Sequence, residues 1–252
     1  MTDRNDRART HFGYEQVPVA EKRQRVGAVF TSVAQRYDIM NDVMSMGIHR
    51  LWKALTVHMA GVKTAQTCLD LASGTGDIAA RLARAVGSQG LVVASDINRA
   101  MLSTGRDRLL DRGIIGNIDY IQADAEDLPF ADNSFDCATM AFGLRNVTRK
   151  ERALASLARV LKPGARLYVL EFSKPVSPLL SSIYDQYSFK LLPAMGKLIA
   201  GDSDSYQYLA ESIRMHPDQD TLKDIMLSSG FDHCEYLNLS GGIVALHQAC
   251  KY

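Results

Sequence analysis

The sequence predicts a doubly wound, Rossmann-like α/β fold with a mostly parallel sheet of seven strands. From residue 66 onward, short apolar runs alternate with helical stretches, as they do when helices cover both faces of a parallel sheet. A glycine-rich turn follows the first apolar run, at the kind of position where such folds bind ligands. The expected strands are Thr67–Ala72, Leu91–Ser95, Ile118–Gln122, Phe135–Phe142, Arg166–Phe172, Cys234–Leu239 and Ile243–His247.

Helices are expected between these strands. Lys162-Pro163-Gly164 should end the helix that precedes Arg166, and Gly230 should end the last helix. The final two strands flank Ser240-Gly241-Gly242, which is typical of a hairpin turn. The expected helices are Asp77–Val86, Arg99–Arg112, about 150–161 and 221–229.

Two further regions flank or interrupt this alternation. Residues 1–60 are expected to form an N-terminal helical cap and 61–252 the main domain. Within the cap, residues 1–20 are polar and expected to be frayed, whereas 21–60 should be helical. The apolar face of this cap comprises Val26, Val29, Phe30, Val33, Ala34 and Tyr37. Residues 174–216 form an expected insertion without strands, in which an amphipathic helix carries Leu180, Ile183, Tyr184, Tyr187 and Leu191.

Composition excludes several classes of protein. The 252 residues are 46% hydrophobic, enough for one large domain with a sizeable core. A formal net charge of +1 argues against a nucleic-acid-binding protein, although Lys22, Arg23 and Arg25 form a local basic patch. The four cysteines lack metal-ligand spacing and are expected to be reduced core thiols. The polar N-terminus is unlike a secretory signal and no apolar run is long enough to span a membrane, so a cytoplasmic protein is expected.

The glycine-rich turn runs from Asp70 to Asp77. Gly74, Gly76 and Ala79 fit the dinucleotide pattern G-x-G-x-x-G/A. A carboxylate at Asp77, where a helix begins, would repel a pyrophosphate, and Asp70 adds a second acid nearby. These acids favour a phosphate-free, positively charged cofactor, S-adenosylmethionine, over a nicotinamide or flavin dinucleotide. A glycine turn without a ligand is the third alternative.

Two further acids follow the next strands. Asp96 lies about 20 residues after Gly76, the spacing at which a carboxylate accepts hydrogen bonds from ribose hydroxyls. Its alternative role is the N-cap of the following helix. Asp124 follows the third strand and could accept from an adenine amino group, with the backbone N–H of Ala125 meeting a ring nitrogen. The alternative for Asp124 is a solvated acid in a turn.

Longer segments carry a resemblance to a known family. These are Tyr37–Ser45 with His49 and Trp52, Phe142–Val147, Arg159–Gly164 through Glu171–Ser173, and Arg214–Gln219. With the glycine turn they resemble the ubiquinone/menaquinone biosynthesis C-methyltransferases, which are class I methyltransferases, over essentially the whole chain. Ser73, Ala141 and Ala165 depart from the family pattern. Ala141 stands where some members carry a serine that faces the cofactor, and alanine cannot make that hydrogen bond.

The resemblance implies S-adenosylmethionine-dependent methylation of a ring carbon on 2-methoxy-6-polyprenyl-1,4-benzoquinol, on demethylmenaquinol, or on both. Alternatives are another small aromatic or lipid acceptor, a dinucleotide oxidoreductase, or a scaffold without turnover. The resemblance implies that Thr75, Asp96, Asp124 and Ala125 line the cofactor site. The full expected set is Asp70, Gly74, Thr75, Gly76, Asp96, Asp124, Ala125 and Ala141.

The candidate catalytic residues are Arg145, Asn146, His216 and Tyr37. Arg145 and Asn146 follow the fourth strand, where Arg145 could stabilise a phenolate and Asn146 orient a ring oxygen. The alternative for Arg145 is a surface salt bridge. His216 and His49 are candidate bases, or structural histidines. Tyr37 could bind a ring oxygen or pack in the core, and no metal is required.

The prenyl tail of such a substrate needs an apolar groove. The insertion offers Leu179, Leu180, Tyr184, Tyr187, Leu191 and Leu192, which could rest on the inner membrane or form an ordinary packed helix. The expected partner is a polyprenylated quinol and not nucleic acid. Other quinone-biosynthesis enzymes and a second copy of the chain, as a homodimer, are further candidates.

Overall fold

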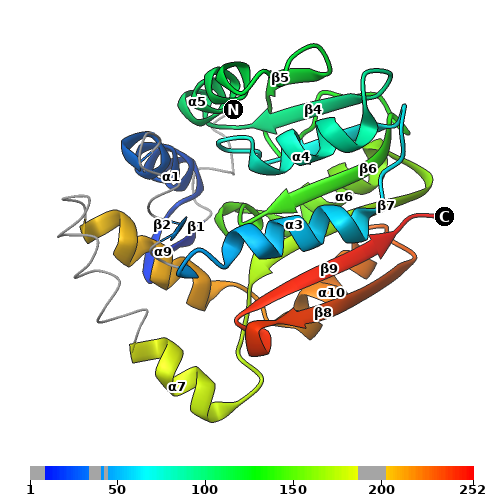
Figure 1. The fold of residues 1–252 in the computed structure, drawn as a ribbon. Coiled ribbons are helices and arrows are strands. Elements are labelled where there is room, and N and C mark those ends of the chain that lie inside the picture. The colour runs from blue at the N-terminus through cyan, green and yellow to red at the C-terminus, as the bar shows by residue number, and fades with distance from the viewer. Residues whose placement is uncertain (1–8, 34–40, 43–44, 187–202) are drawn as a thin grey trace, which may run out of the picture.

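The computed structural model describes residues 9–33, 41–42, 45–186 and 203–252. Seven strands form one sheet in the order β5-β4-β3-β6-β7-β9-β8 (Figure 1). β3 to β7 run parallel, whereas β9 pairs antiparallel with β7 and with β8. The predicted fold class is confirmed. The strands are β3 (Thr67–Leu71), β4 (Leu91–Asp96), β5 (Ile118–Gln122), β6 (Phe135–Ala141), β7 (Leu161–Phe172), β8 (His233–Leu239) and β9 (Val244–Cys250).

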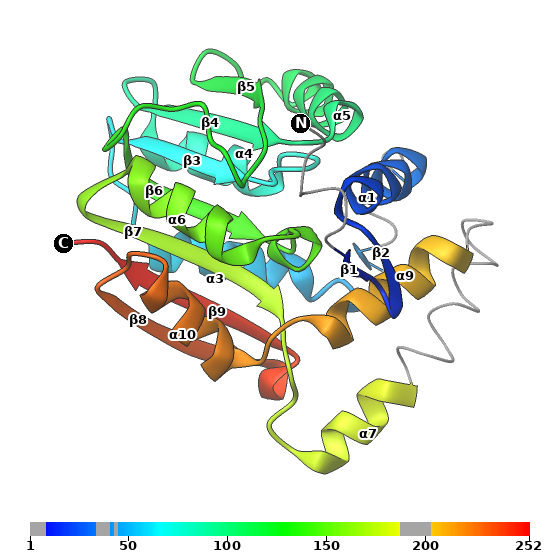
Figure 2. The same ribbon diagram turned by 180° about the vertical axis from the view of Figure 1, so that it is seen from behind.

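Helices cover both faces of the sheet, so the inner strands are apolar on both sides. One core cluster joins the sheet to α3 (His49–Ala60), α4 (Asp77–Val86) and α5 (Arg99–Asp111). The second cluster joins its other face to α6 (Lys150–Val160) and α10 (Gln219–Ser228), as Figure 2 shows from behind. All four cysteines are buried and free.

The N-terminal region differs from the prediction. Residues 9–18, expected to be frayed, form an antiparallel hairpin of β1 (Arg9–Phe12) and β2 (Glu15–Pro18). The hairpin is held by distant residues: Phe12 stacks on Tyr208 with ring centroids 4.2 Å apart, and the Tyr14 amide donates to Glu211 at 3.1 Å. Such tertiary contacts leave no mark on the local pattern. The expected helix over residues 21–33 is confirmed as part of α1 (Val19–Val33).

The start of β7 also differs. Lys162-Pro163-Gly164, expected to separate helix from strand, lies within β7, which begins directly after α6 at Leu161. The register shifts between Phe135 and Cys137 on β6, and Gly164 has a φ of +82°. A bulge near the start of β7 therefore accommodates the proline and the glycine.

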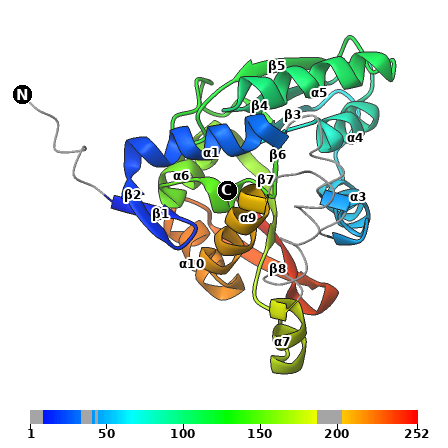
Figure 3. The ribbon, with the colours of Figure 1, turned by 90° about the vertical axis from the view of Figure 1, so that its left-hand side faces the viewer.

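The described part of the insertion contains two helices and no strand, as expected. α7 (Pro178–Gln186) projects from one end of the molecule, and α9 (Ser203–Met215) returns beside the hairpin and α1 (Figure 3). Tyr37, Tyr187, Leu191 and Leu192 lie outside the described residues. No helix in the described ranges is long and apolar enough to cross a membrane.

Candidate functional site

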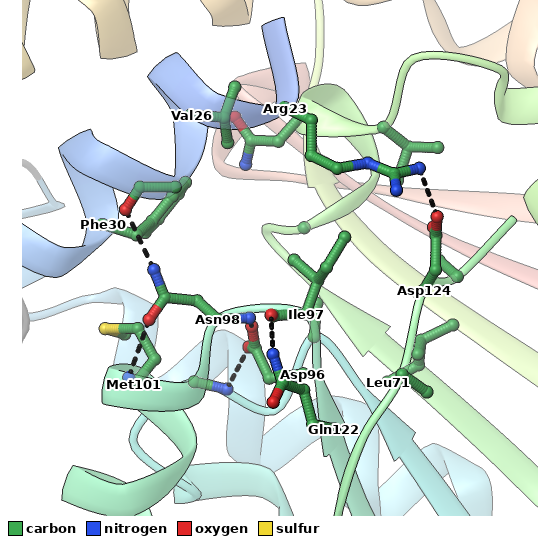
Figure 4. A pocket seen from close by; sticks show the side chains of 18 of the residues that line it. Arg23, Val26, Phe30, Leu71, Asp96, Ile97, Asn98, Met101, Gln122 and Asp124 are labelled. Atoms are coloured by element: carbon green, nitrogen blue, oxygen red, sulfur yellow. Dashed lines mark hydrogen bonds and ion pairs between the residues drawn. The ribbon is translucent and has the colours of Figure 1, made fainter. Parts of the chain in front are cut away.

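A cavity of about 680 Å³ lies at the carboxyl ends of β3, β4, β5 and β6, with α1 across it (Figure 4). Its volume suits a cofactor-sized ligand. Five segments after the strands line it: residues 71–72 with Gly74, 96–101, 122–126, 140–143 and 146–148. The helix α1 contributes Arg23, Val26, Gly27, Phe30 and Thr31. Of the predicted cofactor residues, those that line it are Gly74, Asp96, Asp124, Ala125 and Ala141.

The glycine turn is shaped by close packing against α5. Gly74 and Gly76 have φ values of +56° and +79°, which glycine adopts without strain. A Cβ on Gly105 of α5 would lie 2.7 Å from the Gly74 carbonyl oxygen, so the helix and the turn touch through their backbones. Ala72 and Phe142, which also line the cavity, have φ values of +55° and +56°. Non-glycine residues in this region store strain, and such strain gathers at functional sites.

Asp96 holds the turn and faces the cavity. One carboxylate oxygen accepts from the Gly74 amide at 2.9 Å, and the other from the Asn98 amide at 2.8 Å. Burial raises the pKa of Asp96 above its ordinary value despite these bonds. The alternative role as helix N-cap is wrong, because Asn98 fills that position and accepts from the Met101 amide at 3.0 Å.

Asp124 joins β5 to α1. Its carboxylate forms an ion pair with Arg23 across the cavity (Figure 4) and accepts from the Glu126 amide at 3.0 Å. Asp124 is therefore more than a solvated turn acid. The basic patch at residues 22–25 contained Arg23, but nothing in its local pattern indicated a partner about 100 residues away.

The acids at the two ends of the turn lie differently from the prediction. The described residues that line the cavity include neither Asp70 nor Asp77. Asp70 accepts from Ser73 Oγ at 2.8 Å, Thr139 Oγ1 at 2.8 Å and the Ala79 amide at 3.0 Å, while burial raises its pKa to about 6. Asp70 thus ties the turn to β6 and to α4.

Asp77 is neutralised by two cations. Lys53 and Arg108 lie 3.1 and 3.3 Å from its oxygens. Burial, the largest single influence, raises the pKa of Asp77, but the cations outweigh it and the net shift is downward. The argument that Asp70 and Asp77 repel a pyrophosphate is therefore not supported. Of Asp70, Asp77 and Asp96, Asp96 is the acid that lines the cavity. Thr75 and Gly76 belong to the turn but are not among the described lining residues.

Asn146 also lines the cavity, and it lies on the short 3-10 helix η3 (Leu144–Asn146). Its side-chain oxygen accepts from the Tyr208 hydroxyl at 3.0 Å. Burial raises the pKa of Tyr208, so the hydroxyl stays protonated and available as a donor. Sequence reasoning missed Tyr208, because it comes from the helix α9 of the insertion and no local motif marks it.

Arg145 points away from the larger cavity and into the protein. Its Nη1 donates to Glu171 Oε1 at 2.8 Å, and its guanidinium carbon lies 5.5 Å from the centroid of the Phe172 ring. The two charged side chains are 3% and 1% exposed. The salt bridge is therefore buried and not at the surface, and whether Arg145 also acts on a substrate stays a prediction.

A smaller cavity of about 170 Å³ adjoins the first and shares Thr148 with it. Three chain segments meet there: the β1–β2 hairpin with α1, the residues after β6, and α9. Its lining residues are Thr10, His11, Gly13, Lys22, Arg145, Thr148, Lys150, Tyr208, Ser212 and Met215.

The two candidate histidine bases lie at different places. His216 is 4% exposed, and neither ring nitrogen has a hydrogen-bond partner among the described residues. Burial, with Lys150 and Arg145 adding to it, holds the pKa of His216 well below its ordinary value, so the ring is neutral near pH 7. His49 lies on α3, where its Nδ1 is 2.8 Å from Ser45 Oγ, and burial lowers its pKa. The described lining of the larger cavity includes neither residue.

Comparisons with known proteins agree with this geometry. The sequence model of the ubiE/COQ5 methyltransferase family matches residues 19–251. The chain is 61% identical over 251 residues to a protein of Teredinibacter turnerae named "Ubiquinone/menaquinone biosynthesis C-methyltransferase UbiE", with all of both chains covered. A protein of the same name from Cellvibrio japonicus is 61% identical over 247 residues, covering 98% of this chain and 99% of that one.

Among solved structures, a SAM-dependent methyltransferase from Thermotoga maritima aligns with a TM-score of 0.62 at 19% identity, covering 89% of this chain and 99% of that chain. This likeness supports the fold. The family match and the full-length relatives confirm the predicted class, an S-adenosylmethionine-dependent C-methyltransferase. The chain belongs to the ubiE/COQ5 methyltransferase family.

Proposed function

We propose that this protein transfers the methyl group of S-adenosylmethionine to a ring carbon of a polyprenyl benzoquinol, of demethylmenaquinol, or of both. The observation that carries the proposal is one cavity with Asp96 at the carboxyl end of β4 and Asn146 beyond the end of β6. The relatives' printed name supports both the ubiquinone and the menaquinone branch. Another aromatic or lipid acceptor is the alternative.

The residues present fit the cofactor. The carboxylate of Asp96 accepts from the backbone amides of Gly74 and Asn98, one on each oxygen, and the pair of oxygens retains capacity to accept from the two neighbouring hydroxyls of a ribose. Gly74 allows close approach of the backbone, and Ala125 and Ala141 leave room for the cofactor. An adenine amino group would share the Asp124 carboxylate with Arg23 or displace it, so we infer that cofactor binding loosens α1.

The bound cofactor supplies an activated methyl group on a sulfonium. The protein must then hold the acceptor carbon in line with that methyl, and orientation of this kind can contribute about 7–11 kcal/mol. Asn146, fixed by Tyr208, orients a ring oxygen. The Arg145–Glu171 pair anchors η3, which carries Asn146, to the end of β7. A direct role of Arg145 toward a phenolate remains a prediction, as do roles for His216 and Tyr37.

The decisive experiment uses both purified protein and cells. Incubation with S-adenosylmethionine and a short-tail benzoquinol or naphthoquinol should yield products one methyl heavier by mass spectrometry. Cells lacking the protein should accumulate quinones one methyl short. Normal quinones in such cells, or methylation of only other acceptors, would contradict the proposed substrate class.

We further infer that the region around α7 receives the prenyl tail at a membrane surface. Val176 and Leu179 are 65% and 73% exposed, whereas Tyr184 is buried in the core and serves packing. The protein should co-sediment with vesicles that contain quinol, and Leu179→Glu should weaken this association. Full activity of that variant on long-tail quinol in vesicles would argue against the inference.

A further inference from the structure

Two lysines line the smaller cavity, and neither forms an ion pair with a described residue. Lys22 is 5% exposed and makes no hydrogen bond or ion pair with any described residue. Lys150 donates only to the Val147 carbonyl oxygen, at 3.3 Å, among the described residues. Lys150 is half-buried, whereas Lys22 is buried. Burying an unpaired ammonium is costly, so Lys22 with a second ammonium facing the same cavity forms an arrangement that an anion would stabilise.

Three carboxylates lie near Lys150. Glu151 is exposed and forms no ion pair with a described residue, whereas Glu171 and Glu126 are already occupied. Glu171 accepts from Arg145 Nη1 at 2.8 Å and from the Phe172 amide at 2.9 Å. Glu126 accepts from Arg149 Nε at 2.7 Å and from the Arg149 amide at 3.0 Å. Since Glu171 cancels the charge of Arg145, the positive charge that remains at the cavity is that of Lys22 and Lys150.

The pKa values of the lysines agree with this imbalance. Burial, reinforced by Lys150, lowers the pKa of Lys22 to about 8, and Glu126 offsets only part of this. Burial also lowers the pKa of Lys150, against the opposing charges of Glu171, Glu151 and Glu126. An anion in the cavity would raise both values.

The position of the cavity indicates which anion it receives. Thr148 lines both cavities, and Tyr208 lines the smaller one while donating to Asn146, which lines the larger one. The unpaired cations therefore lie behind the residue that we expect to orient the ring oxygen of the acceptor.

We propose that Lys22 and Lys150 form an oxyanion site that stabilises the ionised ring oxygen of the hydroquinone acceptor. This proposal rests on the proposed function. The phenolic proton passes to water, and the phenolate is held by the two ammonium groups. The ring carbon then forms a bond to the methyl as the methyl–sulfur bond breaks, and that electron pair stays on sulfur. Loss of the ring proton to water restores the aromatic ring.

A first test needs no turnover. The absorbance of 4-nitrophenol reports its ionisation, and the titration is done with S-adenosylhomocysteine bound to the protein. The wild type should bind the phenolate and lower the pKa of the phenol below its value in free solution. Lys22→Met and Lys150→Met should each reverse part of that shift. Absence of binding to the wild type, or equal shifts in all variants, would overturn the proposal.

A second test separates charge from structure. Because Lys22 is buried and unpaired, Lys22→Met should leave the melting temperature of the free protein unchanged or raise it. Its kcat on a short-tail quinol should fall roughly 10–100-fold, with an unchanged KM for S-adenosylmethionine. The rise of its rate with pH should move to higher pH. The titratable and charged groups that surround Lys22 and stay unchanged in this variant are His11, Glu126, Arg145, Lys150, Glu151, Glu171, Tyr208 and His216. A lower melting temperature with normal kcat would make Lys22 structural and refute the proposal.

Lys63→Met is the matched control, since Lys63 is exposed and precedes β3 at the opposite edge of the sheet. It should change neither kcat nor the nitrophenol titration. If the wild type methylates no quinol and yet ionises nitrophenol in a Lys22-dependent way, the proposed function fails while the oxyanion site stands. If the wild type turns over quinol normally and Lys22→Met does so equally well, the proposed function stands and the oxyanion site is refuted.

Discussion

The two sides of the ligand-binding region are built in different ways. On the side that we propose binds the cofactor, called the cofactor side, β3, the glycine turn and α4 follow one another in the chain, and Asp96 comes from the adjacent strand β4. On the side that we propose binds the acceptor, called the acceptor side, Asn146 of η3 is bonded to Tyr208 of α9, and Tyr208 stacks on Phe12 of the N-terminal hairpin. The cofactor side therefore depends on short local motifs, and the acceptor side depends on contacts between segments distant in sequence. Variants can test how independent these two sides are.

The largest effect is expected where the acceptor side is anchored to the sheet. Arg145→Met leaves Glu171 buried without its partner and should destabilise the protein by about 3–5 kcal/mol, measured by urea unfolding. Arg145→Met with Glu171→Gln should recover much of this loss. If the double variant regains stability and kcat, Arg145 is purely structural. A residual loss of about 10²-fold in kcat with normal cofactor affinity would support its predicted contact with a phenolate.

Asp96→Ala should affect the cofactor side alone. It removes the acceptor for ribose hydroxyls and should weaken S-adenosylhomocysteine binding by about 1.5–3 kcal/mol in calorimetry. NAD should not bind to the wild type. Asp132→Ala, at an exposed acid paired with Arg159, is the matched control. If folded Asp96→Ala protein binds S-adenosylhomocysteine with unchanged affinity, the role of Asp96 is only to hold the glycine turn through its hydrogen bond from Gly74.

The pH dependence of stability should report Asp70. Its pKa in the folded protein, about 6, lies above the ordinary value of 3.8, so the folded state binds its proton more tightly. The stabilising contribution is complete below about pH 4 and is lost as pH rises through 6, by roughly 1 kcal/mol per pH unit at most. Asp70→Asn should remove this component between pH 4 and 6. Parallel stability curves for the variant and the wild type would contradict this assignment.

The smallest effect is expected at the link between α1 and the sheet. The Arg23–Asp124 pair is substantially exposed on the arginine side, so Arg23→Gln should change stability by less than about 1 kcal/mol. Hydrogen exchange in α1 should nevertheless become faster, because Arg23 supplies its ion pair to the sheet. The other polar ties between α1 and the loop before α5 are the hydrogen bonds from Asn98 Nδ2 to the Gly27 carbonyl oxygen and to Thr31 Oγ1, both at 3.0 Å, among the described residues. Arg106→Gln, at another exposed ion pair, serves as the control. Equal exchange in both variants would show that Arg23 does not restrain α1.

The predicted parts of the site are those with a local signal. Gly74, Asp96, Asp124 and Ala125 follow strands whose apolar character is visible in the sequence, so their meeting at one sheet edge could be expected. Arg23, Tyr208 and Glu171 could not be placed in this way, because each acts through a partner on another segment. Lys22 could not be placed either, because only the folded chain shows that it lines a cavity. A charged or hydroxyl side chain has the same local pattern whether its partner is water or protein.

By itself, the sequence determined the parallel sheet, the glycine turn and the carboxyl edge as the ligand-binding side. Apolar runs of strand length must be buried, and helices between them fix the parallel order. Only the tertiary structure decided which charges face the two cavities. Asp70 and Asp77 turn into the protein because Thr139, Lys53 and Arg108 bind them there. Lys22 and Lys150 face a cavity, since Glu171 and Glu126 already bind other cations. Burial makes an unpaired charge costly, so the direction in which each side chain points depends on partners that only the folded chain brings together.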